Sequence, residues 1–370
     1  MAQTDLVLYR RACKVIPTGV GTYSKMPDRF GNGFPIYSRW SEGPYVWDSR
    51  GEGYIDMASA LGAVILGHNN KYIRQKIRQF AGDGEIMSLT HPKVVELAER
   101  LVSLIPCAEQ VRFLTSGSEA TTAAVKIARA YTNRDLIITF KDHYHGWHPW
   151  FSYTQPKSAG SGLAHTVSCI EVDKLFTLRA APAAVIMEPA RFEALPLEAI
   201  RKWCTQWAVV LIFDEVVTGF RYPGGSAQKH FGVTPDLACF GKALTNGMAP
   251  FSFVCGKKEL MQVIEKDCFI SSTYAESLTA ITAAMATLDV LESEKWPIWD
   301  IGREILKDLP VKHKGFPCRF MLDVRREFLV ECCKRGLLIG PHLSIFPTLA
   351  HRGIIDKIKE IINKVASTNC

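Results

Sequence analysis

Apolar stretches and amphipathic stretches alternate through the middle of the chain. Five stretches are apolar almost throughout, which is typical of strands that are buried on both faces. They are VRFLT (111–115), LIITF (136–140), AAVIME (183–188), VVLIFDE (209–215) and DLACFG (236–241). The stretches between them include two with helical periodicity, EATTAAVKIARAYT (119–132) and LEAIRKWCTQWA (197–208). This alternation predicts an α/β fold, with a mostly parallel central sheet and helices on both faces.

The flanking parts of the chain have a mixed pattern. PYVWDSRGEGYIDM predicts a hairpin near the start, and HPKVVELAERLVSLI predicts a helix with Val94, Leu97, Leu101 and Leu104 on one face. After a helix at ITAAMATLDVLE (281–292), the tail alternates short strand-like and helical pieces, ending in a helix from Gly353 onward. We therefore expect a large α/β domain (61–292) and a small α+β lobe. Residues 1–60 and 293–370 would form that lobe.

Composition narrows the class of protein. The 370 residues are 47% hydrophobic and 22% charged, as in ordered globular proteins. The net charge of +7 comes from scattered Lys and Arg, which disfavours a nucleic-acid partner. No apolar run reaches the ~20 residues of a membrane span, and MAQTDLVLYRRACKVIP resembles an amphipathic helix more than a signal peptide. Eleven cysteines without a C-x-x-C motif predict reduced thiols in the cytoplasm.

Two acids end the most apolar of these stretches. In VVLIFDE, five apolar residues lead directly into Asp214 and Glu215. A buried carboxylate is costly unless it is protonated or meets a cationic partner. Because ligands of open α/β sheets bind beyond the carboxyl ends of the strands, we look for that partner among groups at other strand ends.

Three other strand ends carry suitable groups. Ser116, Gly117 and Ser118 follow VRFLT and lead into a helix expected to begin with Glu119; this arrangement suits an anion, although it also suits a simple helix cap. Tyr144 and His145 follow LIITF. Their neighbours include two more histidines, but this spacing without a nearby carboxylate or cysteine does not indicate a metal site.

Lys242 follows DLACFG, 28 residues after Asp214. By itself it could be a surface cation. Together, however, an anion cradle, an aromatic ring, a buried carboxylate and a lysine are what pyridoxal 5'-phosphate requires. Its protonated pyridine nitrogen would be the cation that Asp214 needs.

Several long motifs also resemble one known family. They are TSGSEATTAAVKIARAYT, YHGWH, LIFDEVVTGFR, FGVTPDLACFGKALTNG and SSTYAESLTAITAAMATL. Over nearly the whole chain they resemble the fold-type I, class III pyridoxal-phosphate aminotransferases. The likeness is to the glutamate semialdehyde aminomutase-like branch, which includes relatives from sugar and surface-polysaccharide pathways.

This resemblance implies a role for each matching residue. Lys242 would form the Schiff base and carry protons, and Asp214 would pair with the ring nitrogen. Tyr144, with His145 beside it, and Val216 would pack on opposite faces of the ring. The phosphate would be held by Ser116, Gly117 and Ser118. Thr273 would reach the neighbouring subunit's cofactor phosphate, which makes a homodimer with shared active sites.

The substrate residues depart from the aminomutase pattern. Where the aminomutase has a carboxylate-binding arginine, this chain has Lys25, a point charge that cannot give a bidentate fork. Glu276 in SSTYAES resembles the sugar-pathway branch, and Arg319 is a candidate anion contact or a structural ion pair. The small lobe also looks shortened.

The sequence therefore predicts an aminotransferase that moves an amino group from a small amino donor to a small keto or aldehyde acceptor. An intramolecular aminomutase is the alternative, followed by a racemase or decarboxylase. A pyridoxal-phosphate-fold binding protein without catalysis is the alternative of a different class, and the intact Lys242 and Asp214 argue against it.

Overall fold

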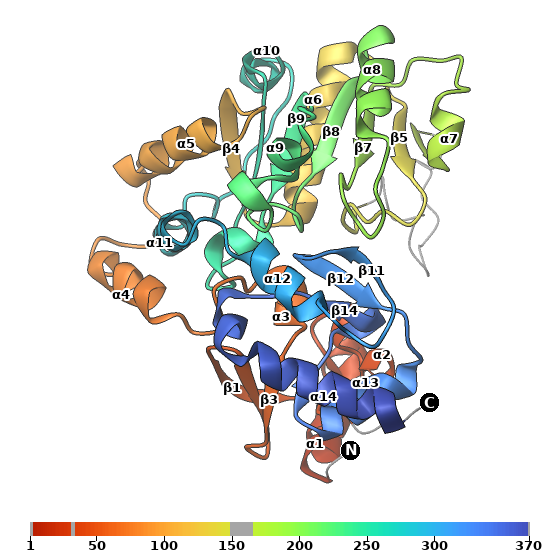
Figure 1. Cartoon of the computed structure of the whole chain (residues 1–370). Helices are drawn as coiled ribbons and strands as arrows, with labels where there is room; N and C mark the ends of the chain where they lie inside the picture. Colours follow the sequence, from red (N-terminus) through yellow and green to blue (C-terminus); the bar gives the residue numbers. More distant parts are fainter. Residues whose placement is uncertain (1–2, 31–33, 149–165, 369–370) are drawn as a thin grey trace. The chain divides into compact units, whose positions relative to one another are not determined.

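The computed structural model describes residues 3–30, 34–148 and 166–368 (Figure 1). The chain divides into two compact units. One combines residues 1–71 with 297–370, and the other comprises residues 72–296. From the sequence, we expect the limits of the large domain at residues 61 and 292. These domain limits stay a prediction.

A seven-stranded sheet forms the centre of the second unit (Figure 1). Its strands are β4 (Gln110–Leu114), β5 (Ile137–Phe140), β6 (Val167–Ile170), β7 (Ala184–Met187), β8 (Val210–Asp214), β9 (Leu237–Phe240) and β10 (Ser252–Gly256). Their order is β4-β10-β9-β8-β7-β5-β6, and only β10 runs antiparallel to its neighbours. The predicted mostly parallel α/β sheet is confirmed.

Two strands of this sheet, β6 and β10, are absent from the sequence prediction. Their sequences are VSCI and SFVCG. Both mix polar with apolar residues over four or five positions. Runs this short carry no clear period, so their pairing with β5, β4 and β9 decides their conformation.

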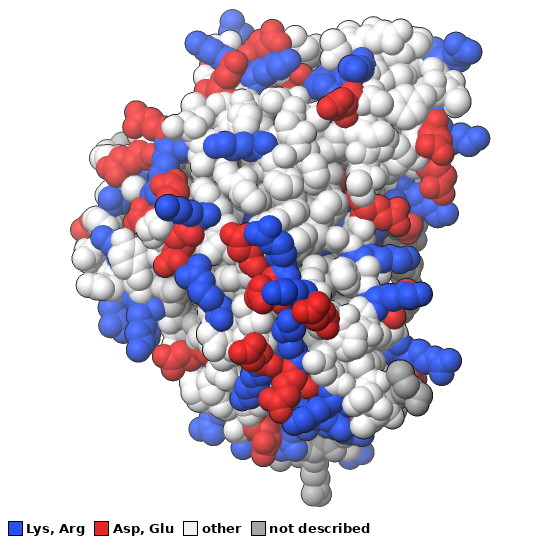
Figure 2. All heavy atoms as spheres, viewed as in Figure 1, with Lys and Arg blue, Asp and Glu red and all other residues white. Residues whose placement is uncertain are grey.

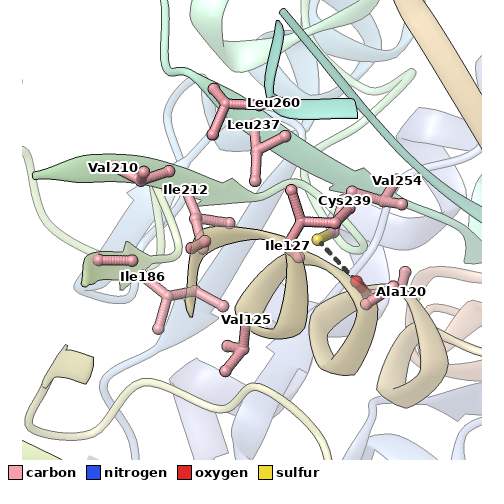
Figure 3. Packing of buried hydrophobic residues seen from close by; sticks show 14 of the residues in the cluster. Ala120, Val125, Ile127, Ile186, Val210, Ile212, Leu237, Cys239, Val254 and Leu260 are labelled. Atoms are coloured by element: carbon pink, nitrogen blue, oxygen red, sulfur yellow. Dashed lines mark hydrogen bonds between the residues drawn. The ribbon is translucent and has the colours of Figure 1, made fainter. Parts of the chain in front are cut away.

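The core of the second unit lies on both faces of the sheet. Every residue of β5, β7, β8 and β9 is buried. On one face, helix α6 (Gly117–Thr132) packs Val125 and Ile127 against apolar side chains of the strands (Figure 3). The Cys239 thiol donates a hydrogen bond to the Ala120 carbonyl of α6, at 3.4 Å. Helix α8 (Leu197–Gln206) contacts β8. Burial on both faces explains why these strands are apolar throughout.

The second unit contains further α-helices. They are α4 (Lys71–Phe80), which starts at the unit boundary, α5 (Pro92–Leu104), α7 (Val172–Leu175), α9 (Ala227–Phe231), α10 (Lys258–Met261) and α11 (Leu278–Ser293). Helix α5 buries Val94, Leu97 and Leu101 as its periodicity predicts. Arg100 on α5 pairs with Asp289 on α11 at 2.8 Å, which ties these two helices together.

The first unit is built from both ends of the chain. Its strands are β1 (Ser38–Glu42), β2 (Tyr45–Asp48), β3 (Gly53–Asp56), β11 (His313–Phe316), β12 (Arg319–Leu322), β13 (Leu337–Leu338) and β14 (Ser344–Ile345). Its helices are α1 (Gln3–Ala12), α2 (Pro27–Phe30), α3 (Ser59–Gly62), α12 (Ile298–Leu306), α13 (Arg326–Lys334) and α14 (Ile355–Thr368). β2 and β3 form the predicted hairpin, and β13 pairs with β3 in parallel. The two ends of the chain therefore share one sheet.

Charged side chains of both signs are interspersed on the face drawn in Figure 2. That face carries no continuous basic surface among the residues that the structure describes. None of the described helices is both long and apolar enough to span a membrane.

Candidate active site

The turn from β4 into α6 is shaped to receive an anion. Helix α6 begins at Gly117, two residues earlier than expected, and Ser116 is its N-cap. The Ser116 hydroxyl accepts a hydrogen bond from the Glu119 amide at 3.2 Å. The two interpretations of this turn, a helix cap and an anion site, are therefore compatible. A capped helix start still presents unpaired amides at its N-terminus.

Glu119 holds this turn in place. Its carboxylate accepts hydrogen bonds from the amide and the hydroxyl of Thr115. Burial opposes ionisation of Glu119, but the hydrogen bonds from Thr115 outweigh it and lower the pKa of the carboxyl group. Gly117 is required here for a steric reason, since a Cβ at this position would lie 2.8 Å from Cγ1 of Val216. Val216 therefore packs directly over the helix start.

A loop after β5 brings Tyr144 and His145 to the sheet edge. The Tyr144 amide donates to Oε1 of Glu188 at 3.1 Å, and the Glu188 amide donates to Nδ1 of His143 at 3.0 Å. The Thr121 hydroxyl donates to the His145 carbonyl at 2.7 Å, which ties the loop to α6. Partial burial, and then the charge of Asp214, raise the pKa of the Tyr144 hydroxyl. The Tyr144 side chain remains 48% exposed, so its ring is accessible to a ligand.

Asp214 ends β8 and is buried, with its two carboxylate oxygens engaged separately. Oδ1 accepts a hydrogen bond from the Val216 amide at 3.1 Å. Oδ2 lies 2.8 Å from Nδ1 of His145. The sequence placed His145 near the cofactor but gave no sign of this contact with Asp214.

The adjacent acid, Glu215, has a different environment. It is fully buried, and it accepts hydrogen bonds from the Thr218 hydroxyl, from the Ala227 amide, and from both the amide and the side chain of Gln228. Burial raises the pKa of Glu215 despite these hydrogen bonds. Its partners all belong to the segment that follows β8, so of the two acids in VVLIFDE only Asp214 is directed to the loop that carries His145.

Lys242 lies just beyond β9, the strand next to β8. Asp214 pairs with Cys239 in the sheet register, and the Glu215 amide donates to the Cys239 carbonyl at 2.8 Å. Only two residues lie between Cys239 and Lys242, so Lys242 and Asp214 lie at the same edge of the sheet. The backbone of Lys242 has φ +41°, a left-handed conformation that costs energy for a residue with a side chain. Such strained positions are concentrated at functional sites.

A cavity of about 490 Å³ opens beside the start of α6. It is lined by Ser116, Ser118, Trp147 and His148, and by the segment 269–272. Burial lowers the pKa of His148 to about 4, so this ring is neutral at pH 7. The helix amides at the start of α6 and the Lys126 ammonium, which also lines the cavity, are the features that attract an anion.

The segment before α11 is fastened to this cavity. The Arg112 guanidinium donates to the Ile270 carbonyl at 2.6 Å, and the Lys126 ammonium donates to the Phe269 carbonyl at 2.7 Å. Thr273 and Glu276, which follow in SSTYAES, are exposed. Lys25 and Arg319 belong to the first unit, and their roles stay predictions.

These residues fit the phosphorylated pyridine cofactor expected from sequence. The donor set holds an accessible helix N-terminus, an accessible aromatic ring, a buried carboxylate and a lysine, drawn from the carboxyl ends of β4, β5, β8 and β9. At Gly117, a larger residue would displace the Val216 side chain from the helix start. The roles of the individual residues toward such a cofactor stay predictions.

Comparisons with known proteins also support a site for a phosphorylated pyridine cofactor. The model of the class-III aminotransferase family matches residues 29–172 and 177–309. The chain is 33% identical to glutamate-1-semialdehyde 2,1-aminomutase of Methanothrix thermoacetophila over 310 residues, which cover 77% of this chain and 71% of that protein.

Solved structures share the fold over the full length. The PLP internal aldimine form of the Sphingopyxis sp. MTA144 FumI protein superimposes with a TM-score of 0.88 and 25% identity, covering 99% of this chain and 96% of FumI. An omega-transaminase from Sphaerobacter thermophilus gives a TM-score of 0.85 at 24% identity, with coverage of 98% and 97%. The second likeness supports the fold alone.

Proposed function

The chain belongs to the class-III aminotransferase family, and from that premise we propose that it binds pyridoxal 5'-phosphate and transfers an amino group between small molecules. The donor is an amine, and the acceptor is a keto or aldehyde compound. The observation that carries this proposal is the convergence of Ser116–Ser118, Asp214 and Lys242 at one edge of the sheet.

Each end of the cofactor has a matching group. The amides of Gly117 and Ser118 at the start of α6 would hold the phosphate, because a helix N-terminus favours negative charge. Tyr144 and Val216 would pack on the ring faces. Asp214 would accept a hydrogen bond from the protonated ring nitrogen, with His145 keeping its carboxylate in place.

When bound, pyridoxal phosphate supplies an electron sink that stabilises negative charge on the substrate carbon next to the amino group. The protein residues supply the rest. Asp214 keeps a proton on the ring nitrogen, and a buried carboxylate does this well because solvent does not screen it. The Lys242 amine would remove a proton from the donor carbon that bears the amino group, and its ammonium form would deliver a proton to the carbonyl carbon of the acceptor. Lys242 follows β9, the strand that pairs with β8, so Lys242 and Asp214 can contact the same cofactor.

The active form is proposed to be a homodimer in the cytoplasm. Trp147, Phe269 and Tyr274 expose apolar side chains, and Trp147 and Phe269 line the cavity beside Ser116. A second copy that covers this surface would bring its Thr273 to the phosphate site. All ten cysteines in the described part of the chain are free thiols, as is usual in a reducing compartment.

The alternative is an aminomutase, which returns the amino group to another carbon of the same substrate. The likeness to glutamate-1-semialdehyde 2,1-aminomutase favours it. Against it stands Lys25, since the carboxylate-binding arginine of the aminomutase pattern is replaced in this chain. The two activities require the same cofactor residues.

The test begins with cofactor attachment. The purified protein is incubated with pyridoxal phosphate, reduced with borohydride and digested; a pyridoxyl group on the peptide that contains Lys242 is the expected result. An amino donor labelled with ¹⁵N should pass its label to an added carbonyl acceptor. If the label stays out of the acceptor while glutamate 1-semialdehyde is isomerised, the aminomutase is correct. Wild-type protein that takes up no pyridoxal phosphate would refute both.

A further inference from the structure

The segment between β7 and α8 contains an arginine close to the proposed site. β7 lies between β5 and β8 in the sheet and ends at Met187. Glu188 and Arg191 follow directly, before α8 begins at Leu197. This segment therefore starts between the loop of Tyr144 and the end of β8 that carries Asp214.

Glu188 connects this segment to the loop of Tyr144. Its carboxylate is buried and accepts the Tyr144 amide at 3.1 Å, while its own amide donates to His143 at 3.0 Å. Two hydrogen bonds in opposite directions fix the spacing between the segment and the loop. The residues that follow Glu188 therefore start beside the backbone of the Tyr144 loop.

Arg191 lies beside Glu188, but its Nε does not donate a hydrogen bond to that carboxylate. Its Nε lies 3.8 Å from Oε1 of Glu188, which is too long for a hydrogen bond. That Nε is buried and has no hydrogen-bond partner among the residues that the structure describes. The side chain as a whole is about one-third exposed, at 32%. The guanidinium group can therefore reach solvent and still has donors to offer.

Three other arginines of the second unit have structural contacts. Arg112 donates to the Ile270 carbonyl, Arg134 to the Ala208 carbonyl, and Arg201 to the Asp236 carboxylate. Each of these contacts joins two elements of the unit. Arg191 differs because its nearest acid, Glu188, is only three residues away and already accepts the Tyr144 amide.

We propose that Arg191 binds the carboxylate of an amino acid or keto acid substrate, an inference that rests on the proposed aminotransferase function. A guanidinium group offers a planar pair of donors that matches a carboxylate in a bidentate way. Glu188 holds the arginine at the site and lowers the cost of burying part of its charge. Arg191 would supply the bidentate carboxylate contact that a lysine such as Lys25 cannot make.

The test compares amino donors with and without a carboxylate. In Arg191→Gln, the apparent dissociation constants for glutamate and alanine should rise roughly 10- to 100-fold, the scale of a lost charge-assisted hydrogen bond. The value for isopropylamine, which has no carboxylate, should change less than about two-fold. Arg191→Lys should fall between the wild type and the glutamine variant. Arg179→Gln, at an exposed arginine of the same unit, is the control and should alter neither.

A second readout does not depend on turnover. Binding of succinate to the protein with pyridoxal phosphate added, measured by calorimetry, should weaken by a similar factor in Arg191→Gln. The affinity for pyridoxal phosphate should stay unchanged. If Arg191→Gln loses affinity for glutamate and isopropylamine equally, or loses affinity for pyridoxal phosphate, then Arg191 only supports Glu188 and the Tyr144 loop.

Failure of the two proposals can be told apart. Wild-type protein that takes up no pyridoxal phosphate would refute the proposed function. Succinate binding that depends on Arg191 would then still support a carboxylate site. Succinate binding that is the same in wild type and Arg191→Gln, or absent from both, would overturn the carboxylate site whether or not the protein transfers amino groups.

Discussion

Nδ1 of His145 lies 2.8 Å from Oδ2 of Asp214, and both side chains are buried. His145 follows β5 and Asp214 ends β8, and β7 separates these two strands in the sheet. The contact between His145 and Asp214 therefore spans the carboxyl end of β7. It fixes one oxygen of Asp214, while the Val216 amide fixes the other. The carboxylate that is expected to meet the cofactor is held in place before any ligand arrives.

Replacing His145 should loosen Asp214. In His145→Ala, the buried carboxylate loses a hydrogen-bond partner, so affinity for pyridoxal phosphate should fall roughly 10-fold and unfolding stability by about 1–3 kcal/mol. Equilibrium dialysis and urea unfolding measure these two quantities. His145→Asn can place an amide donor near the position of Nδ1 and should recover part of both losses. Equal behaviour of the alanine and asparagine variants would argue against the hydrogen bond.

Gly117→Ala should impair the phosphate site by a steric route. The new Cβ would lie 2.8 Å from Cγ1 of Val216, which is well inside van der Waals contact. Val216 must then shift from its place over the helix start, and the affinity for pyridoxal phosphate or free phosphate should fall. The double variant with Val216→Ala removes the clashing methyl group. Its phosphate affinity should exceed that of Gly117→Ala; if it does not, the clash is not the cause.

Mixed dimers test whether Thr273 acts across a subunit interface. Lys242→Ala should abolish turnover, and Thr273→Ala should weaken cofactor retention several-fold. In a dimer that contains one subunit of each kind, one active site has a native Lys242 and a native Thr273 from its partner. Activity after mixing and reassembly should therefore exceed that of either variant alone. If Thr273 serves its own subunit, no recovery follows.

Asp236 should make the second unit sensitive to acid. Burial opposes its ionisation, but the Leu211 amide, Lys257 and Arg201 together lower the pKa of this carboxyl group. A lowered pKa in the folded state means that the stabilisation is complete above the unfolded value of about 3.9 and is lost as pH falls through the folded value.

The comparison is Asp236→Asn against wild type by urea unfolding at several pH values. At pH 7 and pH 5 the variant should be less stable by about 3 kcal/mol, because it leaves Arg201 and Lys257 without their acid. Below pH 4 the difference should shrink. Asp173→Asn, at an exposed position, should show little difference at any pH. A pH-independent difference for Asp236→Asn would contradict this assignment.

Local patterns along the chain were sufficient for most of the architecture. Strands β5, β7, β8 and β9 are apolar on both faces and end near the predicted residues, because burial on both sides of a parallel sheet demands that composition. Helix α6 begins two residues early, at Gly117, since Ser116 and not a later residue caps it. Strands β6 and β10 were missed, since four or five mixed residues acquire strand structure only through their neighbours.

The sequence by itself determined the α/β class, the family, and which polar residues stand at the ends of strands, because each of these is a property of one continuous segment. Only the tertiary structure decided which of those residues meet. His145 and Asp214 are 69 positions apart, and Tyr144 and Glu188 are 44 apart. Their contacts follow from the strand order β8-β7-β5, which differs from the order along the chain. The placement of Arg191 near the Tyr144 loop depends on the same order, because no local pattern records which strands become neighbours.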